Sequence, residues 1–179
     1  MIFYTSDLHF GHRNSIDFDN RPVSDVEEMD AWLIKNWNAK VCEKDEVYIL
    51  GDFAYRNKKP FDWYLQQLKG RKHLIIGNHD GEMLKSDTAM GYFDSVEKMQ
   101  HVVDGGRHIC LCHFPLAEWN GSHRGSWHIY GHIHAGRTET YSFMKAKEKA
   151  LNAGCMINNY APVTLEELIR NNKKFREEM

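Results

Sequence analysis

The sequence has few of the features that mark secreted, fibrous or membrane-spanning proteins. Its 179 residues include only four cysteines, too few and too scattered for the disulfide framework of a small secreted domain, and none forms a C-x-x-C pair. No stretch approaches the ~18 consecutive apolar residues of a membrane helix. The N-terminus also lacks a basic segment followed by a long apolar run. We therefore expect a cytoplasmic protein with reduced cysteines and no membrane partner.

An excess of basic charge is also missing. The 23 Lys and Arg residues against 25 Asp and Glu give a formal net charge of −2, which excludes a broad basic field and hence extended nucleic-acid binding. The hydrophobic fraction of 42% and the charged fraction of 27% are ordinary for a globular protein. The length fits one domain over residues 1–179. The eleven histidines are the unusual feature, because histidine is the commonest metal ligand.

The first half of the chain alternates buried strands with amphipathic helices. Ser24 and Glu27 have the spacing of a capping box, and Pro60 is suited to the start of a second helix. Strand, helix, strand, helix, strand with short connections predicts a parallel sheet covered by helices. Strands are expected at 2–5, 46–50 and 73–76, and helices at 25–38 and 60–70.

The second half follows another pattern. Residues 96–103 and 109–113 flank an Asp-Gly-Gly turn, which predicts a β-hairpin. Further strands are expected at 127–130 and between 151 and 157. Thr164 and Glu167 have capping-box spacing before a last helix, expected at about 165–174. The fold class predicted from residues alone is α/β.

Residues suited to metal binding follow the apolar runs, one group after another. Ligands of open α/β sheets bind outside the carboxyl ends of the strands, so these groups can meet. Mixed nitrogen and oxygen donors suit Mn, Fe or Zn, and their number fits two ions, with Asp52 as a bridge. The alternating D-x-H and H-x-H spacings lead us to expect extended local backbone. The groups comprise Asp7 and His9; Asp52; Asn78, His79 and Asp80; His113; and His132 and His134.

In their order and approximate spacing, these motifs resemble those of the calcineurin-like metallophosphoesterase superfamily. The resemblance runs from residue 5 to residue 134 and rests on five motifs. It implies a β-sandwich of two mixed sheets flanked by helices, and hydrolysis of phosphate esters at a binuclear metal centre. The motifs are Asp7-x-His9, Gly51-Asp52, Gly77-Asn78-His79-Asp80, His113 and Gly131-His132-x-His134.

The resemblance also implies a role for each residue. His79 would face the substrate without binding metal. Oriented by Asp80, it would protonate the leaving alkoxide or stabilise the transition state. The ions would lower the pKa of a bridging water, so that hydroxide attacks phosphorus in line. One ion would be held by Asp7, His9, Asp52 and His134, and the other by Asp52, Asn78, His113 and His132.

Four further residues are candidates for substrate contact. His12 lies close to the first motif, with a solvent-facing loop position as the alternative. Arg56 sits four residues after Asp52, where phosphoprotein phosphatases of the superfamily place an arginine, but the second acidic residue of their motif is missing. Trp119 and Arg124 belong to a loop that could be a substrate-facing lid or an ordinary hydrophilic loop.

The expected activity is that of a phosphodiesterase or broad phosphoesterase. One alternative is a protein or small-molecule phosphomonoesterase, and another is a non-catalytic metal-binding scaffold. The scaffold disagrees with the sequence, because all seven metal ligands and His79 are present. Two divalent ions are the expected cofactors, with Mn favoured over Fe, Zn and Ni. The expected substrate is a phosphate ester, with a nucleotide or a nucleic-acid end among the candidates.

Overall fold

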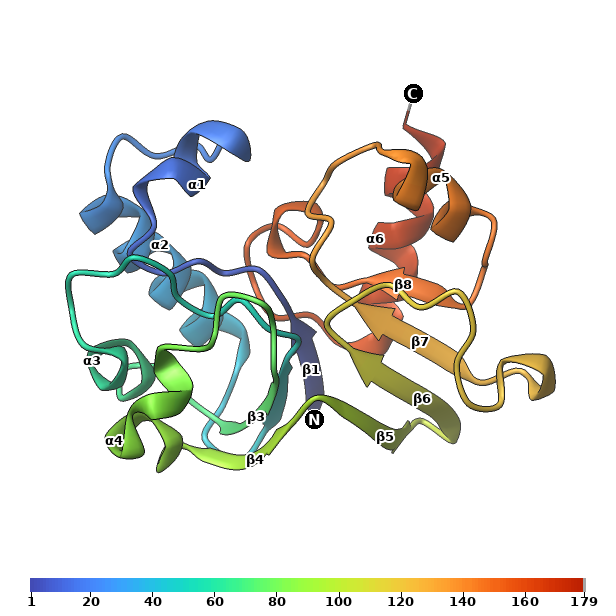
Figure 1. The fold of residues 1–179 in the computed structure, drawn as a ribbon, viewed down its shortest axis with the longest axis horizontal. Coiled ribbons are helices and arrows are strands. Elements are labelled where there is room, and N and C mark those ends of the chain that lie inside the picture. Colours follow the sequence, from blue (N-terminus) through green and yellow to red (C-terminus); the bar gives the residue numbers. More distant parts are fainter. Residues whose placement is uncertain (179) are drawn as a thin grey trace.

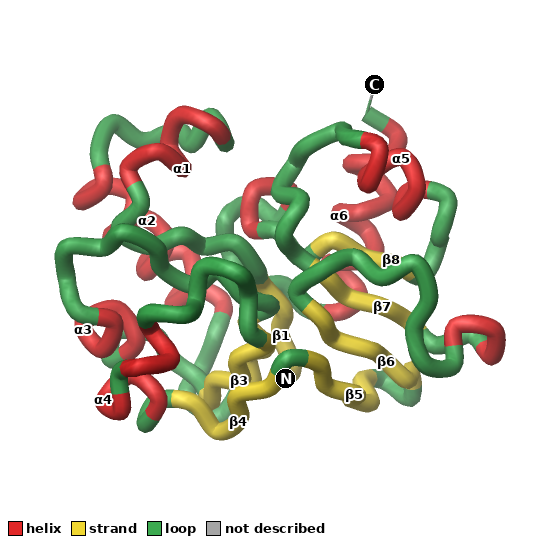
Figure 2. Tube along the Cα trace, in the orientation of Figure 1, coloured by secondary structure: helices red, strands yellow, loops and turns green. Residues whose placement is uncertain are grey.

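A computed structural model describes residues 1–178 as two four-stranded sheets with helices on their outer sides (Figures 1 and 2). The predicted α/β class and the two-sheet architecture are confirmed. The first sheet has the order β1-β2-β3-β4 and is entirely parallel, so the expectation of two mixed sheets is wrong for this one. Its strands are β1 (Ile2–Thr5), β2 (Glu46–Ile49), β3 (Arg71–Ile75) and β4 (Phe93–Glu97).

The second sheet is mixed and has the order β5-β6-β7-β8. The predicted hairpin is confirmed as the antiparallel pair β5–β6, and the other pairs are parallel. Val96 was expected in the hairpin but belongs to β4, where it pairs with Leu74 of the first sheet. The strands are β5 (Met99–Asp104), β6 (Arg107–Cys112), β7 (Trp127–Tyr130) and β8 (Ala150–Asn152).

Helices cover the outer side of each sheet. On the first sheet, at the left of Figure 1, lie α1 (Arg13–Phe18), α2 (Val26–Lys40), α3 (Phe61–Leu65) and α4 (Asp87–Met90). On the second lies α5 (Glu139–Lys145), whereas α6 (Leu165–Glu177) packs beside the edge strands β1 and β8, with Leu165 and Leu168 in the layer between the sheets. Residues 1–178 also contain three short 3₁₀ helices: η1 (Met83–Lys85), η2 (Ser122–Arg124) and η3 (Cys155–Ile157).

Alternation along the strands divides the core into two layers. In β1, Phe3 packs under the helices while Tyr4 faces the other sheet, as the two-residue period of a strand requires. The layer between the sheets includes Tyr48, Ile75, Ile109, Leu111 and Ile129, and the helix-side layer includes Leu33, Trp37, Val47, Leu65 and Leu74. Packing on both faces makes the first sheet a rigid base for the loops at its strand ends.

Two predicted helix ends differ from the structure. Asp25 rather than Ser24 is the N-cap of α2, and its side chain accepts a hydrogen bond from the backbone N–H of Glu28 at 2.8 Å. Helix α3 ends at Leu65 instead of continuing to Gly70. Side chains of α2 bind backbone carbonyls of the segment that follows α3. Trp37 Nε1 donates to the Lys69 carbonyl, and Asn38 Nδ2 donates to the Gln67 carbonyl. The capping box of α6 is formed as expected.

Two expectations drawn from what the sequence lacks can be compared with the fold. None of the helices within the described chain combines the length and apolar composition that crossing a bilayer requires. All four cysteines are unpaired thiols, and three of them are buried.

His128 of β7 makes the stability of the fold depend on pH. Its buried Nδ1 donates to the Cys110 carbonyl at 3.0 Å, while Nε2 accepts from the Leu116 N–H at 3.1 Å, so the ring is held neutral. Burial lowers the pKa of His128 from 6.5 to about 4. The unfolded chain therefore binds the proton more tightly, and stability is lost as pH falls from about 6.5 to about 4.

We expect this loss to reach about 3 kcal/mol. Urea unfolding of wild type and His128→Gln between pH 7.5 and 4.5 measures this loss. The variant should be less stable at pH 7.5, and its free energy of unfolding should change less as the pH falls. His108→Gln, an exposed position on β6, is the control. Parallel pH profiles for wild type and His128→Gln would contradict the assignment.

Candidate metal centre

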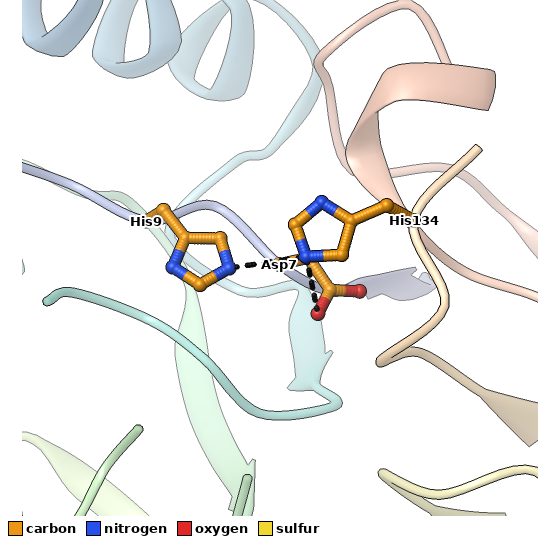
Figure 3. Close-up of side chains that lie close together, drawn as sticks. All are labelled: Asp7, His9 and His134. Carbon is orange, nitrogen blue, oxygen red and sulfur yellow. Dashed lines mark hydrogen bonds and ion pairs between the residues drawn. The ribbon is translucent and has the colours of Figure 1, made fainter. Parts of the chain in front are cut away.

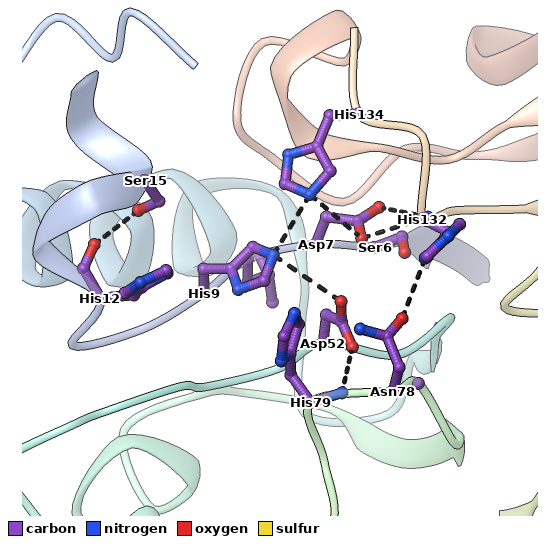
Figure 4. A network of polar contacts seen from close by, with 12 residues as sticks. Ser6, Asp7, His9, His12, Ser15, Asp52, Asn78, His79, His132 and His134 are labelled. Carbon is purple, nitrogen blue, oxygen red and sulfur yellow. Dashed lines mark hydrogen bonds and ion pairs between the residues drawn. The ribbon is translucent and has the colours of Figure 1, made fainter. Parts of the chain in front are cut away.

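The residues predicted to bind metal do meet at one place, where strands of both sheets end (Figure 4). Parallel strands bring their carboxyl ends to the same edge, which collects segments far apart in sequence. Asp7 and His9 follow β1, Asp52 follows β2, Asn78 and His79 follow β3, His113 follows β6, and His132 and His134 follow β7.

Asp7, His9 and His134 form a first ligand group (Figure 3), with one donor atom from each lying within 4.8 Å of the others. His9 Nε2 lies 3.3 Å from His134 Nε2, and the latter lies 3.8 Å from Asp7 Oδ1. Asp7 and His9 are buried, so these donors face one another rather than solvent. This group could hold one divalent cation.

A second ligand group consists of Asp7, Asp52 and His113. Asp52 Oδ2 lies 3.6 Å from His113 Nε2 and 3.8 Å from His9 Nε2, so this one oxygen stands between the two groups. The other oxygen, Oδ1, accepts the backbone N–H of His79 at 2.9 Å. Asp7 also belongs to both groups, whereas only Asp52 was expected to be shared.

Asn78 and His132 adjoin the second group. Asn78 Oδ1 lies 3.0 Å from His113 Nε2 and 2.9 Å from His132 Nδ1. The backbone N–H of His132 points at both oxygens of Asp7, at 3.2 and 3.0 Å. Seven predicted ligands thus lie in one continuous network.

The hydrogen bonds of the outer ring nitrogens show that the centre fits metal ions. His113 Nδ1 lies 2.6 Å from the Leu50 carbonyl, which can only accept, so a neutral ring carries its lone pair on Nε2. That lone pair faces Asn78 Oδ1, which is another acceptor. Two acceptors at 3.0 Å repel each other unless a proton or a cation lies between them. A divalent cation relieves this repulsion and uses both donors.

Burial favours the uncharged form of both Asp7 and His9, and a bound cation would reverse this shift for the Asp7 carboxyl but reinforce it for the His9 ring. Burial raises the pKa of Asp7 to about 6, although His134 and His113 oppose the shift. Burial, followed by the charges of His134 and Arg21, lowers the pKa of His9 to about 2, so its ring is neutral and has a lone pair to donate. Neutral imidazole beside a poorly compensated carboxylate is the state in which these residues bind metal.

The backbone at the ligands is left-handed, so the expectation of extended backbone was wrong. Of the nine non-glycine residues with positive φ in the described chain, five are predicted ligands: Asp7, His9, Asp52, His132 and His134, with φ between 51° and 70°. Such conformations cost about 1–3 kcal/mol each and persist where surrounding contacts enforce them. They turn side chains from short loops toward a common point.

Two glycines allow the loops to approach one another. Gly51 has φ +84°, and a Cβ there would lie 2.5 Å from His113 Nδ1. A Cβ at Gly131 would overlap Ser6 Oγ and lie 2.8 Å from Asp7 Oδ2. Both positions therefore require glycine for close packing of backbone against ligand side chains.

Asp19 and Arg21 support the first ligand group and could not be recognised in the sequence. His134 Nδ1 donates to Asp19 Oδ1 at 2.9 Å, which leaves Nε2 for the metal. Arg21 pairs with Asp19 at 2.9 Å and donates to the carbonyls of Asp7 and Leu8, so it also holds the left-handed loop. Burial lowers the pKa of His134, but the Asp19 hydrogen bond and the charges of Asp7 and Asp19 together outweigh it, so the net pKa is raised.

We expect Asp19→Asn to weaken metal binding at the first group about 10- to 100-fold, because carboxylates behind ligating histidines have effects of this size. Isothermal titration of EDTA-treated protein with Mn²⁺ measures the change. Asp17→Asn is the control, since the exposed Asp17 carboxylate pairs only with Arg13. Unchanged affinity in Asp19→Asn would contradict the supporting role.

His79 lies beside the first group and is half-buried. Its ring centre is 5.6 Å from that of His9 and 4.1 Å from that of Tyr55. The contact between His79 and Tyr55 could not be predicted from the sequence. The exposed Arg56 guanidinium lies over the Tyr55 ring, 5.3 Å from its centre. His12 is buried, and its ring centre lies 5.0 Å from that of Tyr55. Arg56 and His12 therefore do lie near His79.

Asp80 has a different position from the one expected. Its carboxylate is fully buried and accepts backbone N–H groups of Gly77, Asp52 and Phe53 at 2.7–3.0 Å. Its hydrogen bonds within the described chain do not include the His79 ring, so the orienting contact is corrected. Asp80 instead ties the loops after β2 and β3 together and thereby positions Asp52.

Trp119 and Arg124, predicted as substrate contacts, are not brought to the metal centre, which favours an ordinary loop over the alternative of a substrate-facing lid. Trp119 Nε1 donates to the Ser126 carbonyl, and its ring packs 5.3 Å from that of His128 on the outer face of the second sheet. Arg124 lines a separate cavity of about 820 Å³ that includes His101 and Trp127. Arg124 lies just before the start of β7, whereas the ligands His132 and His134 follow the end of this strand.

Comparison with known proteins places the chain among relatives of similar length. No family model matches it. It is 38% identical to an uncharacterized protein of Methanocaldococcus jannaschii over 94% of this chain and 89% of that protein. It is 33% identical to the gene 66 protein of mycobacterium phage L5, over 74% of this chain and 77% of the phage protein.

One solved structure shows the same fold over almost the whole chain. A protein of unknown function from Aquifex aeolicus superposes with a TM-score of 0.73 at 26% identity, covering 95% of this chain and 98% of that one. A nuclease from Pseudomonas putida matches more weakly, with a TM-score of 0.49 at 20% identity, over 74% of this chain and 60% of the nuclease.

Proposed function

The chain belongs to the family that includes the Methanocaldococcus jannaschii protein and the phage L5 gene 66 protein, and we propose that it is a metal-dependent phosphoesterase. The observation that carries this proposal is the position of Asp52 Oδ2, between His9 and His113. A carboxylate oxygen facing two ligand groups suits a pair of cations that share one anionic ligand.

The first ion would be held by His9 and His134 with Asp7 and Asp52, and the second by His113, His132 and Asn78 with Asp52. Asp7 belongs to both ligand groups and could contribute to holding either ion. When bound, two divalent ions supply Lewis acidity, which activates water near neutral pH and offsets the charge of the phosphoryl oxygens. We expect manganese to activate the protein best, with iron, zinc and nickel as the other candidates.

The chain's own residues perform the remaining steps. Arg56, exposed and placed over Tyr55, binds a phosphoryl oxygen. His79 reaches the leaving-group oxygen and donates a proton to it. The hydrogen bond from its backbone N–H to Asp52 ties the position of His79 to that of the shared carboxylate. His12 packs against Tyr55 and holds the Tyr55 ring in place beside His79.

Diesters are the favoured substrates, and a direct assay separates them from monoesters. EDTA-treated protein refilled with Mn²⁺ is assayed on bis-p-nitrophenyl phosphate and on p-nitrophenyl phosphate. We expect Mn-dependent turnover of the diester that exceeds turnover of the monoester. His101→Gln, an exposed histidine on β5, is the matched control and should behave as wild type.

The alternatives correspond to other results of this assay. Preference for the monoester would indicate a phosphomonoesterase. Two bound ions per chain without turnover of either ester would contradict the proposal and favour a metal-binding scaffold.

A further inference from the structure

Two phenylalanine rings beside the metal centre are exposed to solvent. Phe18 is 52% exposed and Phe114 is 45% exposed, although burial of such a side chain is worth about 1.5–3 kcal/mol. A third, Phe143, is 53% exposed but lies on α5, away from the ligands. The first two are therefore distinguished by position rather than by exposure.

The two rings touch different ligand groups. The Phe18 ring centre lies 5.3 Å from that of His134 and 6.2 Å from that of His9. The Phe114 ring centre lies 4.7 Å from that of His132 and 5.0 Å from that of His113. In Figure 4, His9 and His132 lie on opposite sides of Asp7 and Asp52. The centre is thus flanked by one aromatic ring on each side.

We propose that the substrate is a single-stranded nucleic acid, and that the bases on the two sides of the scissile phosphodiester stack on Phe18 and Phe114. This inference rests on the proposed function. Aromatic side chains bind bases of any sequence by stacking. A phosphomonoester presents a group on one side of phosphorus only, whereas two flanking rings suit a diester with a base on each side.

Basic side chains beside Phe18 support a nucleic-acid strand rather than a small aromatic diester with a single phosphate. A cavity of about 330 Å³, which His12 also lines, contains Arg13, Arg56, Lys58 and Lys59, and these outnumber its acidic residues Asp25, Glu27 and Asp30 by one. The Phe18 ring centre lies 5.8 Å from that of His12, so the cavity begins next to the stacking ring. It can bind the next phosphate of the strand. The net charge of −2 limits the contact to a few nucleotides.

The test compares two substrates that differ only in their bases. The Mn-loaded protein is given a single-stranded hexanucleotide and an abasic phosphodiester oligomer of the same length. Each stacked base is expected to contribute about 5- to 150-fold to kcat/KM, so the base-carrying oligomer should be hydrolysed much faster. Deoxyribose and ribose versions of the hexanucleotide identify which nucleic acid is preferred, and either preference supports the proposal.

Variants locate the effect on the two rings. Phe18→Ala and Phe114→Ala should each raise KM for the hexanucleotide about 5- to 150-fold, with a smaller effect on kcat. Phe18→Tyr retains a ring and should keep most of the affinity. Phe143→Ala, which removes an equally exposed ring far from the ligands, should match wild type.

Equal kcat/KM for the base-carrying and abasic oligomers would overturn the inference. So would Phe18→Ala and Phe114→Ala variants that behave like Phe143→Ala. Bis-p-nitrophenyl phosphate in the same preparation separates the two levels of failure. If it is hydrolysed without any base preference, only the inference fails, and if it is not hydrolysed, the proposed function fails as well.

Discussion

Replacement of Asp52 by asparagine is expected to lower kcat/KM for a phosphodiester about a thousandfold and to reduce bound metal below two ions per chain. The Asp52 Oδ2 atom lies between His9 and His113, and only a carboxylate has the charge to stabilise two cations there. Loss of metal-based charge stabilisation is worth several kcal/mol, which corresponds to about three orders of magnitude in rate. Asparagine can still accept the His79 N–H through its amide oxygen, so the loop is retained.

Metal analysis of the purified variant, together with its rate at saturating Mn²⁺, measures both effects. Asp94→Asn is the matched control, because that exposed carboxylate pairs with Arg71 on the first sheet. A variant that holds two ions and keeps its rate within tenfold of wild type would show that Asp52 does not bridge. In that case Asp7, which also belongs to both ligand groups, is the remaining candidate.

The sequence predicted the convergence of the ligands because that convergence depends on local signals. Each apolar run ends in a glycine or a polar residue, and parallel pairing brings those ends together whatever the intervening helices contain. Asp52, Asn78 and His132 could therefore be placed from strand ends alone. The strand pairs β1–β2 and β2–β3 have the parallel register on which this reasoning depends.

Contacts between segments distant in sequence could not be predicted in the same way. Asp19 and Arg21 lie in an irregular stretch after α1, and only the folded chain puts Asp19 beside His134, 115 residues away. Tyr55 was one aromatic residue among many until its ring was found next to His79. Trp119 was misplaced because a loop between two ligand motifs can leave the centre and return.

The left-handed backbone shows why residue spacing alone gave the wrong local geometry. A D-x-H spacing places both side chains on one face in an extended strand, but Asp7 and His9 reach a common point through positive φ instead. Arg21 stabilises this conformation by binding the carbonyls of Asp7 and Leu8. The backbone strain is thus balanced by the buried Arg21 guanidinium, whose role cannot be predicted from the sequence around Asp7.

Replacement of His79 by alanine is expected to reduce turnover about 10²- to 10⁴-fold while both metal ions remain bound. The His79 ring lies beside His9 and against Tyr55, and it belongs to neither metal-ligand group. Its removal therefore eliminates proton donation to the leaving group without removing a metal ligand. The loss should depend on the leaving group, because an alkoxide needs that proton and p-nitrophenolate does not.

Rates for a methyl diester and a p-nitrophenyl diester, with metal analysis of the same samples, measure this dependence. The methyl diester should show the full loss in His79→Ala and the p-nitrophenyl diester a much smaller one, while His101→Gln should change neither. Equal losses for both diesters would mean that His79 binds the phosphoryl group rather than protonating the leaving oxygen. Loss of a metal ion from His79→Ala would place the residue among the ligands instead.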